Sequence, residues 1–209
     1  MQRIRSMRIK VRNRGFGLAV AMVLAASAFA GPLEDGMTAY REKDYSKAAA
    51  LWTSIAEKGD AGAQYYLGTL FAEGKGVPRN DATAFGWFER SAKQGNAEAQ
   101  YNVGASYAAG TGTAKSFEEA AKWFQRAADQ GMVFAQVNLG LLYAAGNGVP
   151  QDNIEAFKWL DIGFRRLPAG ATAMDVVHAM EDVAAKMNRE QIDEAKARAR
   201  QWKPKAEAK

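Results

Sequence analysis

The stretch GTGTAKS, residues 110 to 116, contains the residue types that hold phosphate in nucleotide-binding loops. Gly110 and Gly112 would let backbone N–H groups approach an anion closely. Lys115 would add a positive charge and Ser116 a hydroxyl group beside it. Phosphate binding is therefore the first chemistry that this sequence suggests.

The spacing of this stretch departs from that of a phosphate-binding P-loop. The P-loop pattern has glycine directly before the lysine and again five residues further upstream. This chain has Ala114 and Ala109 at those two positions. A P-loop also follows a β-strand, whereas the residues before this stretch have helical spacing. We therefore predict a loop between two helices and no phosphate site.

The remaining candidates for chemistry are few. His178 is the single histidine, and Asp175 and Asp182 lie at helical spacing from it. A Ser-His-Asp triad stays open at this point, because its members can meet in space whatever their order in the chain. The chain has no cysteine, which excludes disulfides, thiolate metal sites and a cysteine nucleophile. We favour a solvated helix histidine and predict no catalytic residue, no metal and no cofactor.

The first thirty residues resemble a secretory signal peptide. They carry six basic and no acidic residues, followed by the apolar run from Leu18 to Ala30 and small residues at its end. The run is shorter than the roughly 20 residues that span a bilayer as a helix. We predict cleavage after Ala30 and a periplasmic or secreted bacterial protein, with retention as an N-terminal anchor as the alternative.

The excess positive charge belongs entirely to that segment. The net charge is +5, but residues 31–209 contain 22 basic and 23 acidic groups. A basic patch is the usual electrostatic signature of nucleic-acid binding. The sequence therefore predicts neither a nucleic-acid partner nor, after cleavage, a membrane partner.

Most of the chain repeats with a shift of 36 residues. Segments that start at Ala63, Ala99 and Ala135 share alanine, glycine, an aromatic residue, Gly-x-Gly and tryptophan at equivalent positions. Each unit contains two stretches with the apolar spacing of an amphipathic helix. The pattern predicts an all-α, right-handed solenoid of antiparallel helical hairpins with a helical C-terminal cap. The predicted segments are a signal peptide (1–30), a degenerate half-repeat (31–60), three units (61–96, 97–132, 133–166), capping helices (167–203) and a disordered tail (204–209).

Local signals mark the helix ends and the core of each unit. Residues suited to capping the second helix recur as Asp44, Asn80, Ser116 and Asp152. Glu119 and Glu155 follow three residues after two of these and predict capping boxes. Glycines that end the second helix are Gly59, Gly95 and Gly131, and those expected at close helix approaches are Gly68, Gly104 and Gly140. Trp87, Trp123 and Trp159 are expected to be buried between successive units.

Together these motifs resemble the Sel-one-like repeat (SLR), a relative of the tetratricopeptide repeat. The resemblance covers roughly residues 37 to 166 and lies in Ala-Gln, Leu-Gly or Val-Gly, an aromatic residue, Gly-x-Gly-Val-Pro, an N-cap, tryptophan and a closing glycine. The middle unit has Thr113 and Ala114 in place of Val-Pro. We expect its loop to be less rigid for that reason.

The resemblance implies a protein-binding function on the concave face, which the first helix of each hairpin would line. The implied partner-binding track consists of Tyr65, Thr69, Tyr101, Phe134, Val137 and Leu141. We expect the hairpin core not to need its apolar members, unless the capping helices fold over part of the track. The predicted function is an exported adaptor that binds a peptide or helix of a protein in the cell envelope.

Two alternatives belong to other classes of function. One is an accessory or regulatory subunit of a cell-wall enzyme. The other is a weak cell-wall or β-lactam hydrolase, because some SLR proteins are described as penicillin-binding or weakly β-lactamase-like. Serine acylases of that type use serine followed three residues later by lysine. No serine in this chain has lysine at that distance, which disfavours the hydrolase.

Overall fold

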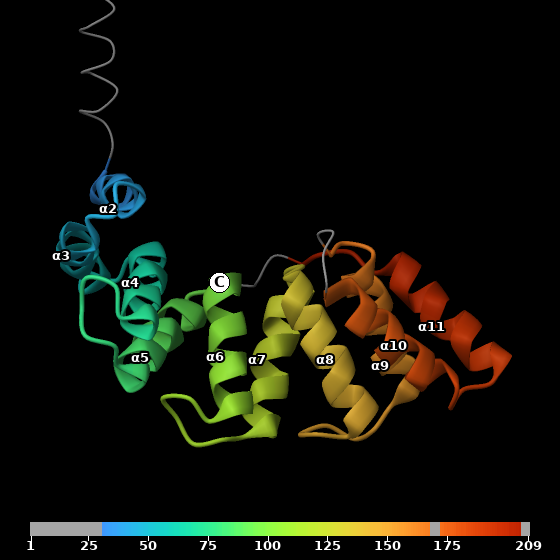
Figure 1. Ribbon diagram of the computed structural model, residues 1–209. Helices are drawn as coiled ribbons and strands as arrows, with labels where there is room; N and C mark the ends of the chain where they lie inside the picture. The colour runs from blue at the N-terminus through green and yellow to red at the C-terminus, as the bar shows by residue number, and fades with distance from the viewer. Residues whose placement is uncertain (1–30, 168–171, 206–209) are drawn as a thin grey trace, which may run out of the picture.

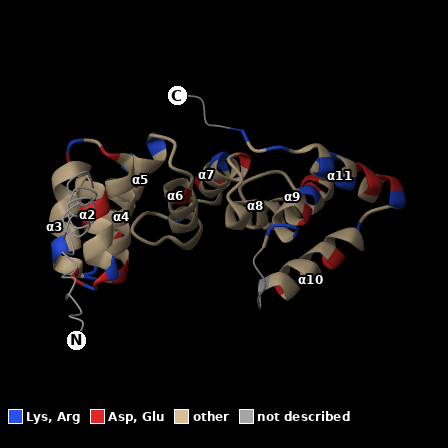
Figure 2. Cartoon of the chain, turned by 90° about the horizontal axis from the view of Figure 1, so that it is seen from above, with Lys and Arg blue, Asp and Glu red and all other residues tan. Residues whose placement is uncertain are grey.

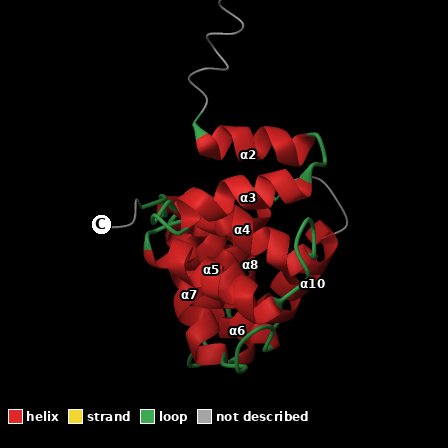
Figure 3. Cartoon of the chain, turned by 90° about the vertical axis from the view of Figure 1, so that its left-hand side faces the viewer, coloured by secondary structure: helices red, strands yellow, loops and turns green. Residues whose placement is uncertain are grey.

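The computed structural model describes residues 31–167 and 172–205, and all regular elements in these ranges are α-helices (Figures 1 and 3). The predicted signal peptide lies outside the described residues. The helices are α2 (Pro32–Arg41), α3 (Tyr45–Ala56), α4 (Ala61–Glu73), α5 (Asp81–Lys93), α6 (Ala97–Ala109), α7 (Phe117–Asp129), α8 (Val133–Ala145), α9 (Asn153–Phe164), α10 (Thr172–Ala184) and α11 (Arg189–Gln201).

Successive helices pair into hairpins that stack in chain order, as the colour gradient in Figure 1 shows. The pairs are α2 with α3, α4 with α5, α6 with α7, and α8 with α9, and each pair packs on the next. The predicted all-α solenoid is thus confirmed. Residues 31–60, which we predict to be a half-repeat, contain two helices joined by a short turn at Glu42–Asp44.

The second helix of each hairpin begins at its predicted cap. The side chains of Asp44, Asn80, Ser116 and Asp152 each accept a hydrogen bond from a backbone N–H in the first turn. The predicted capping boxes are wrong, because the backbone N–H of Ser116 donates to the carbonyl of Tyr107 and that of Asp152 to Tyr143. Glu119 and Glu155 pair instead with Lys122 and Lys158. A cap whose N–H already has a partner gives the glutamate nothing to accept.

The glycines in the middle of α4, α6 and α8 allow the two helices of a hairpin to approach closely. A Cβ atom on Gly68 or Gly104 would lie 2.8 or 2.7 Å from the ring of Phe88 or Phe124. On Gly140 it would lie 2.8 Å from Leu160. The predicted reason for these glycines is therefore confirmed.

The recurring tryptophans pack toward the preceding unit. Trp123 is 9% exposed and lies in a cluster with Phe88 and Val103, while Trp159 is 2% exposed and packs with Phe124 and Leu139. Trp87 is half-buried against the first hairpins. The predicted burial is confirmed for two of the three rings and partial for the first.

The last two helices, α10 and α11, both pack on α9 and so cover the end of the stack. Asn188 caps α11 and forms a reciprocal capping box with Gln191. Lys, Arg, Asp and Glu residues are frequent along α11 in the cartoon of Figure 2, while Ala195 and Ala199 of the same helix are buried. A polar outer face is what a terminal repeat of a solenoid requires.

The chain after α11 turns back along the array. The ring of Trp202 lies edge-on to that of Trp159, with centroids 6.2 Å apart. The backbone N–H of Lys205 donates to the carbonyl of Asp129 over 2.8 Å. Pro204 and Lys205, which we predict to be disordered, are therefore held against α7, and residues 206–209 lie outside the described residues.

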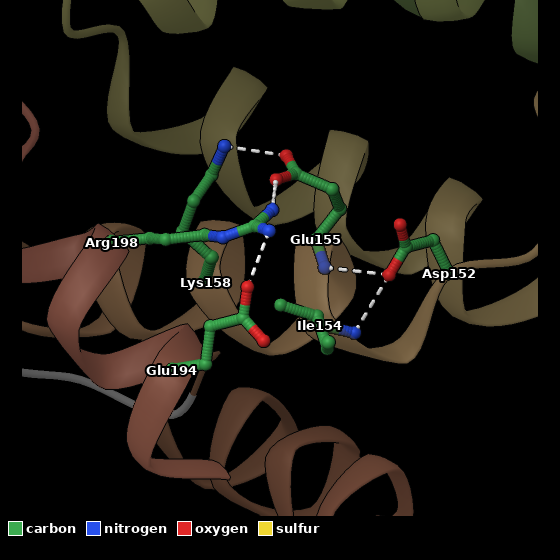
Figure 4. A network of polar contacts seen from close by, with 6 residues as sticks. All are labelled: Asp152, Ile154, Glu155, Lys158, Glu194 and Arg198. Atoms are coloured by element: carbon green, nitrogen blue, oxygen red, sulfur yellow. Dashed lines mark hydrogen bonds and ion pairs between the residues drawn. The ribbon is translucent and has the colours of Figure 1, made fainter. Parts of the chain in front are cut away.

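A polar network ties α11 to α9 (Figure 4). Arg198 pairs with Glu155 over 3.0 Å and with Glu194 over 2.5 Å, and Lys158 also pairs with Glu155. Arg198 is 46% exposed, and ion pairs of exposed groups typically contribute less than about 1 kcal/mol each. The network therefore mainly orients α11 on α9. We expect the apolar contacts of Ala195, Ala199 and Trp202 to contribute more of the free energy that holds α11 in place.

Candidate functional site

The stretch GTGTAKS is a loop between helices, as predicted. Gly110 ends α6 with φ at +76°, and Gly112 has φ at +73°. A Cβ on Gly112 would overlap the backbone carbonyl of Asp81, at the start of α5 in the preceding unit. The Lys115 ammonium lies 4.6 Å from the centroid of the Phe117 ring. The second glycine of each loop is thus a contact between units, a role that sequence reasoning missed although its 36-residue recurrence was visible.

A ladder of buried glutamines also links neighbouring hairpins. Their side-chain amides donate to the last turn of the preceding second helix, from Gln64 to Ala56, Gln100 to Ala92 and Gln136 to Ala128. Gln94 and Gln130 donate in turn to the side-chain oxygens of Gln64 and Gln100, each over 2.8 Å. These hydrogen bonds between neighbouring hairpins give the Ala-Gln motif a structural role.

The candidates for catalysis do not form a site. His178, Asp175 and Asp182 are all exposed on α10. Among residues 31–167 and 172–205, no three histidine or acidic side chains group in a way that could hold a metal ion. Within the same ranges, no helix combines the length and apolar character needed to cross a bilayer.

The six residues of the predicted track fall into two groups. At one end, Tyr65 and Thr69 lie together on α4, where the Thr69 hydroxyl donates to the carbonyl of Tyr65 over 3.1 Å. At the other, Phe134, Val137 and Leu141 follow one another along α8. Tyr101 joins the second group, because its ring centroid lies 6.2 Å from that of Phe134.

The expectation that the core does not need these side chains is wrong for three of them. The ring of Tyr65 packs on Phe88 at 6.0 Å, and that of Tyr101 on Phe124 at 5.8 Å. Val137 packs on α9, where a Cβ on Gly163 would lie 2.8 Å from it. The glycines of the hairpins bring the helices so close that these residues contact both layers.

Phe134 and Leu141 are the free apolar members of the track. Their exposed fractions are 41% and 42%, among the highest of the large apolar residues that the structure describes. The capping helices α10 and α11 leave both side chains open to solvent.

Next to Tyr65 and Thr69 the structure forms an apolar pocket that sequence reasoning missed. Its volume is about 260 Å³, and it is lined by Met37, Tyr40, Arg41, Trp52, Tyr65, Tyr66 and Thr69. These residues come from α2, α3 and α4. The pocket depends on α2, which lies before the three full repeats, so the 36-residue alignment gave no register for Met37, Tyr40 and Arg41.

The pocket walls are fixed by packing and hydrogen bonds. Trp52 is 1% exposed, and its indole N–H donates to the carbonyl of Leu33 over 3.2 Å. Tyr66 stacks on Trp52 with centroids 4.8 Å apart. Gly36 leaves the room that the indole occupies, because a Cβ there would lie 2.6 Å from the indole Cδ1.

The electrostatics of the pocket depend on few groups. Burial and the nearby Glu98 carboxylate raise the pKa of the Tyr65 hydroxyl. Arg41 is the one charged residue in the lining. Outside the lining, Lys75 pairs with Glu73 over 2.7 Å and donates to the Tyr40 hydroxyl, and these hydrogen bonds raise the pKa of Lys75. No arrangement for proton transfer or nucleophilic attack is formed by the lining residues.

Comparison with known proteins agrees with this architecture. The sequence model of the Sel1 repeat family matches residues 26–60, 61–96, 97–132 and 133–163. A Sel1 repeat protein from Oxalobacter formigenes has the same fold, with a TM-score of 0.61, 23% identity and coverage of 90% of this chain and 91% of that one.

A second solved structure is that of a protective antigen present in uropathogenic Escherichia coli strains, which displays an SLR fold. It is 26% identical with a TM-score of 0.54, and the match covers 75% of this chain but only 40% of the antigen. Comparison with curated proteins gives no significant match. Since the repeat model accounts for more than half of the sequence and the structure has the corresponding hairpins, this chain belongs to the Sel1 repeat family.

Proposed function

We propose that this chain is an exported adaptor that binds a peptide or helix of a partner protein on the face formed by α4, α6 and α8. Sel1 repeats generally mediate protein–protein interactions, and the family is typically a non-catalytic scaffold. In a stack of hairpins the first helices line the concave side, a shape that suits extended peptides and helices. Binding by this face requires no chemistry beyond shape and apolar contact.

One observation carries the proposal, namely the exposed apolar side chains on this face. Phe134 and Leu141 lie two turns apart on α8 and are both more than 40% exposed. Burying a fully exposed large apolar side chain contributes about 1.5–3 kcal/mol, so covering the exposed parts of these two side chains would favour association with a partner. Tyr101 extends this surface to the neighbouring unit.

Export is the second part of the proposal and rests on the sequence of residues 1–30. A basic start, a short apolar run and small residues before Gly31 support cleavage. A hairpin stack held by packing suits an exported chain without cysteine. Mass spectrometry of the protein from an envelope fraction should give the mass of residues 31–209, whereas the mass of the full chain would contradict cleavage.

Photo-crosslinking in the producing cells tests the interaction face. Benzoylphenylalanine is placed at Leu141, and at Ser54 as the control, which is exposed on α3 in the other helix layer. We expect Leu141 to give one discrete adduct with another protein, and the additional change Phe134→Ser to weaken it several-fold. Equal adducts from both positions, or none from Leu141, would overturn the proposal.

A further inference from the structure

The size of the pocket between α2, α3 and α4 matches a single large side chain. Its volume is about 260 Å³. A cavity of about 150 Å³ lined by apolar side chains binds benzene, whereas drug-sized ligands occupy about 300–1,000 Å³. The pocket therefore has room for one aromatic or long aliphatic group, but it is small for a cofactor.

Its walls are formed before any ligand arrives. Trp52 and Tyr66 stack on each other, and Tyr65 is held by the ring of Phe88. The Tyr40 ring lies 5.9 Å from that of Trp52 and 5.1 Å from that of Tyr45. A rigid apolar wall lowers the entropy cost of binding, because few side chains must become ordered when a ligand enters.

The charge at the pocket selects the neighbours of that apolar group. The Arg41 guanidinium donates to the carbonyl of Met37 over 3.3 Å and to the hydroxyl of Thr38 over 3.2 Å. Within residues 31–167 and 172–205 it has no carboxylate partner within 4.0 Å, in contrast to Lys75, which pairs with Glu73. Aromatic rings can also bind cations, but the charge of Arg41 in the same lining opposes a cationic side chain.

The opposite side of Tyr65 has the opposite charge. Glu98, in the first turn of α6, is exposed, and its carboxylate contributes to the raised pKa of Tyr65. A partner carboxylate is therefore favoured on the α2 side of the pocket and disfavoured on the α6 side. The two charges give the site a direction along the array.

We infer that this pocket takes a large apolar side chain of an extended partner segment in which an adjacent Asp or Glu pairs with Arg41. The inference rests on the proposed function, since it names the chemistry of the partner on the same face. Charge complementarity selects this acidic and apolar segment over a basic one. Tyr65 and Thr69, two residues of the predicted track, form part of the contact.

The test is an NMR titration of the full chain, with its tryptophan indoles labelled with ¹⁵N. Three capped hexapeptides are added in separate titrations. The peptides are Gly-Gly-Asp-Phe-Gly-Gly, the same with lysine for aspartate, and the same with alanine for phenylalanine. The indole N–H of Trp52, assigned with Trp52→Phe, reports on the pocket because it lies in the wall. We expect the Asp-Phe peptide to bind at least about fivefold more tightly than the Lys-Phe peptide. The Asp-Ala peptide should bind most weakly.

Matched charge reversals decide the role of Arg41. Arg41→Glu should reverse the order of the two phenylalanine peptides. Arg200→Glu makes the same change in net charge on exposed α11, at the other end of the array, and should leave the order unchanged. Equal affinities in the wild type, no shift of the Trp52 signal, or a preference that survives Arg41→Glu would each overturn the inference.

The Leu141 crosslink separates this inference from the proposed function. A discrete adduct from Leu141 with no peptide preference at Trp52 overturns the pocket inference and leaves the adaptor function standing. Loss of the Leu141 adduct contradicts the adaptor function itself, whatever the peptides do.

Discussion

At the scale of single residues, a methyl group can either stabilise or disrupt a hairpin, depending on which glycine receives it. Gly104 and Gly86 both lie within helices, where alanine is favoured over glycine by about 1 kcal/mol. A Cβ on Gly104 would lie 2.7 Å from the Phe124 ring, whereas a Cβ on Gly86 would have nothing within 4 Å. The same substitution should therefore have opposite effects at the two positions.

We predict that Gly104→Ala lowers the free energy of unfolding by about 1–2 kcal/mol, because overpacking a core typically costs about 1–3 kcal/mol and outweighs the gain in helix propensity. Gly86→Ala should raise it by up to about 1 kcal/mol. Urea denaturation followed by circular dichroism measures both. Equal effects of the two variants would show that the hairpin tolerates a wider separation of its helices.

Gly112 tests the contact between units in the same way. Gly112→Ala adds a Cβ against the Asp81 carbonyl at a residue with positive φ, whereas Gly59→Ala meets nothing within 4 Å at φ of +102°. Backbone strain of at least about 1–2 kcal/mol applies at both positions, and it is no smaller at Gly59, whose φ lies farther from the left-handed helical region. We therefore expect Gly112→Ala to be the more destabilising by at least about 1 kcal/mol in urea denaturation. A destabilisation no larger than that of Gly59→Ala would mean that the loop does not position the neighbouring unit.

At the scale of elements, the signals that predicted the hairpins are local and occur three times. An N-cap such as Ser116 and a closing glycine such as Gly131 act within a few residues, so their roles could be read from the sequence. The capping boxes failed because the competing acceptor for the Ser116 N–H is the Tyr107 carbonyl, nine residues earlier on another helix. Contacts between elements decided that outcome, and a short sequence window does not contain them.

The candidate site shows the same division. The sequence predicted that Tyr65, Thr69 and Phe134 lie on the first helices of their hairpins, as they do on α4 and α8, because helical periodicity is a local property. It did not predict the pocket, whose wall combines Trp52 of α3 with Tyr40 and Arg41 of α2. The first hairpin has no Gly-x-Gly loop, and only the packing of α2 on α3 brings these residues together.

The loop of the middle unit gives a prediction at this scale. Val77 and Val149 of the other two loops pack against core clusters, while Thr113 and Ala114 replace Val-Pro in the middle loop. The double change Thr113→Val with Ala114→Pro should raise the free energy of unfolding by about 0.5–1 kcal/mol, largely by restricting the unfolded chain. Thermal and urea denaturation measure the gain. A loss of stability would show that this loop has a backbone incompatible with proline.

At the scale of the whole molecule, stability is transmitted from each hairpin to the next. The principal contacts join neighbours in the stack, and α9 is covered by both α10 and α11. In such arrays the stability of a unit depends on its own contacts and those with its neighbours. A defect at one end should therefore weaken nearby helices more than distant ones.

Trp202 provides the test, because it packs edge-on against the buried Trp159 of α9 and holds the C-terminal end of α11 there. Trp202→Ala should lower the amide hydrogen-exchange protection of α8, α9 and α11 several-fold. The reason is that an uncovered Trp159 lets the final hairpin open more often. The protection of α3 and α4, at the opposite end in Figure 1, should stay within about twofold of the wild type. Hydrogen exchange with mass spectrometry resolves the two ends. A uniform loss of protection from α2 to α11 would instead mean that the array unfolds as one cooperative unit, because the free energy lost at the cap would then be shared by every hairpin.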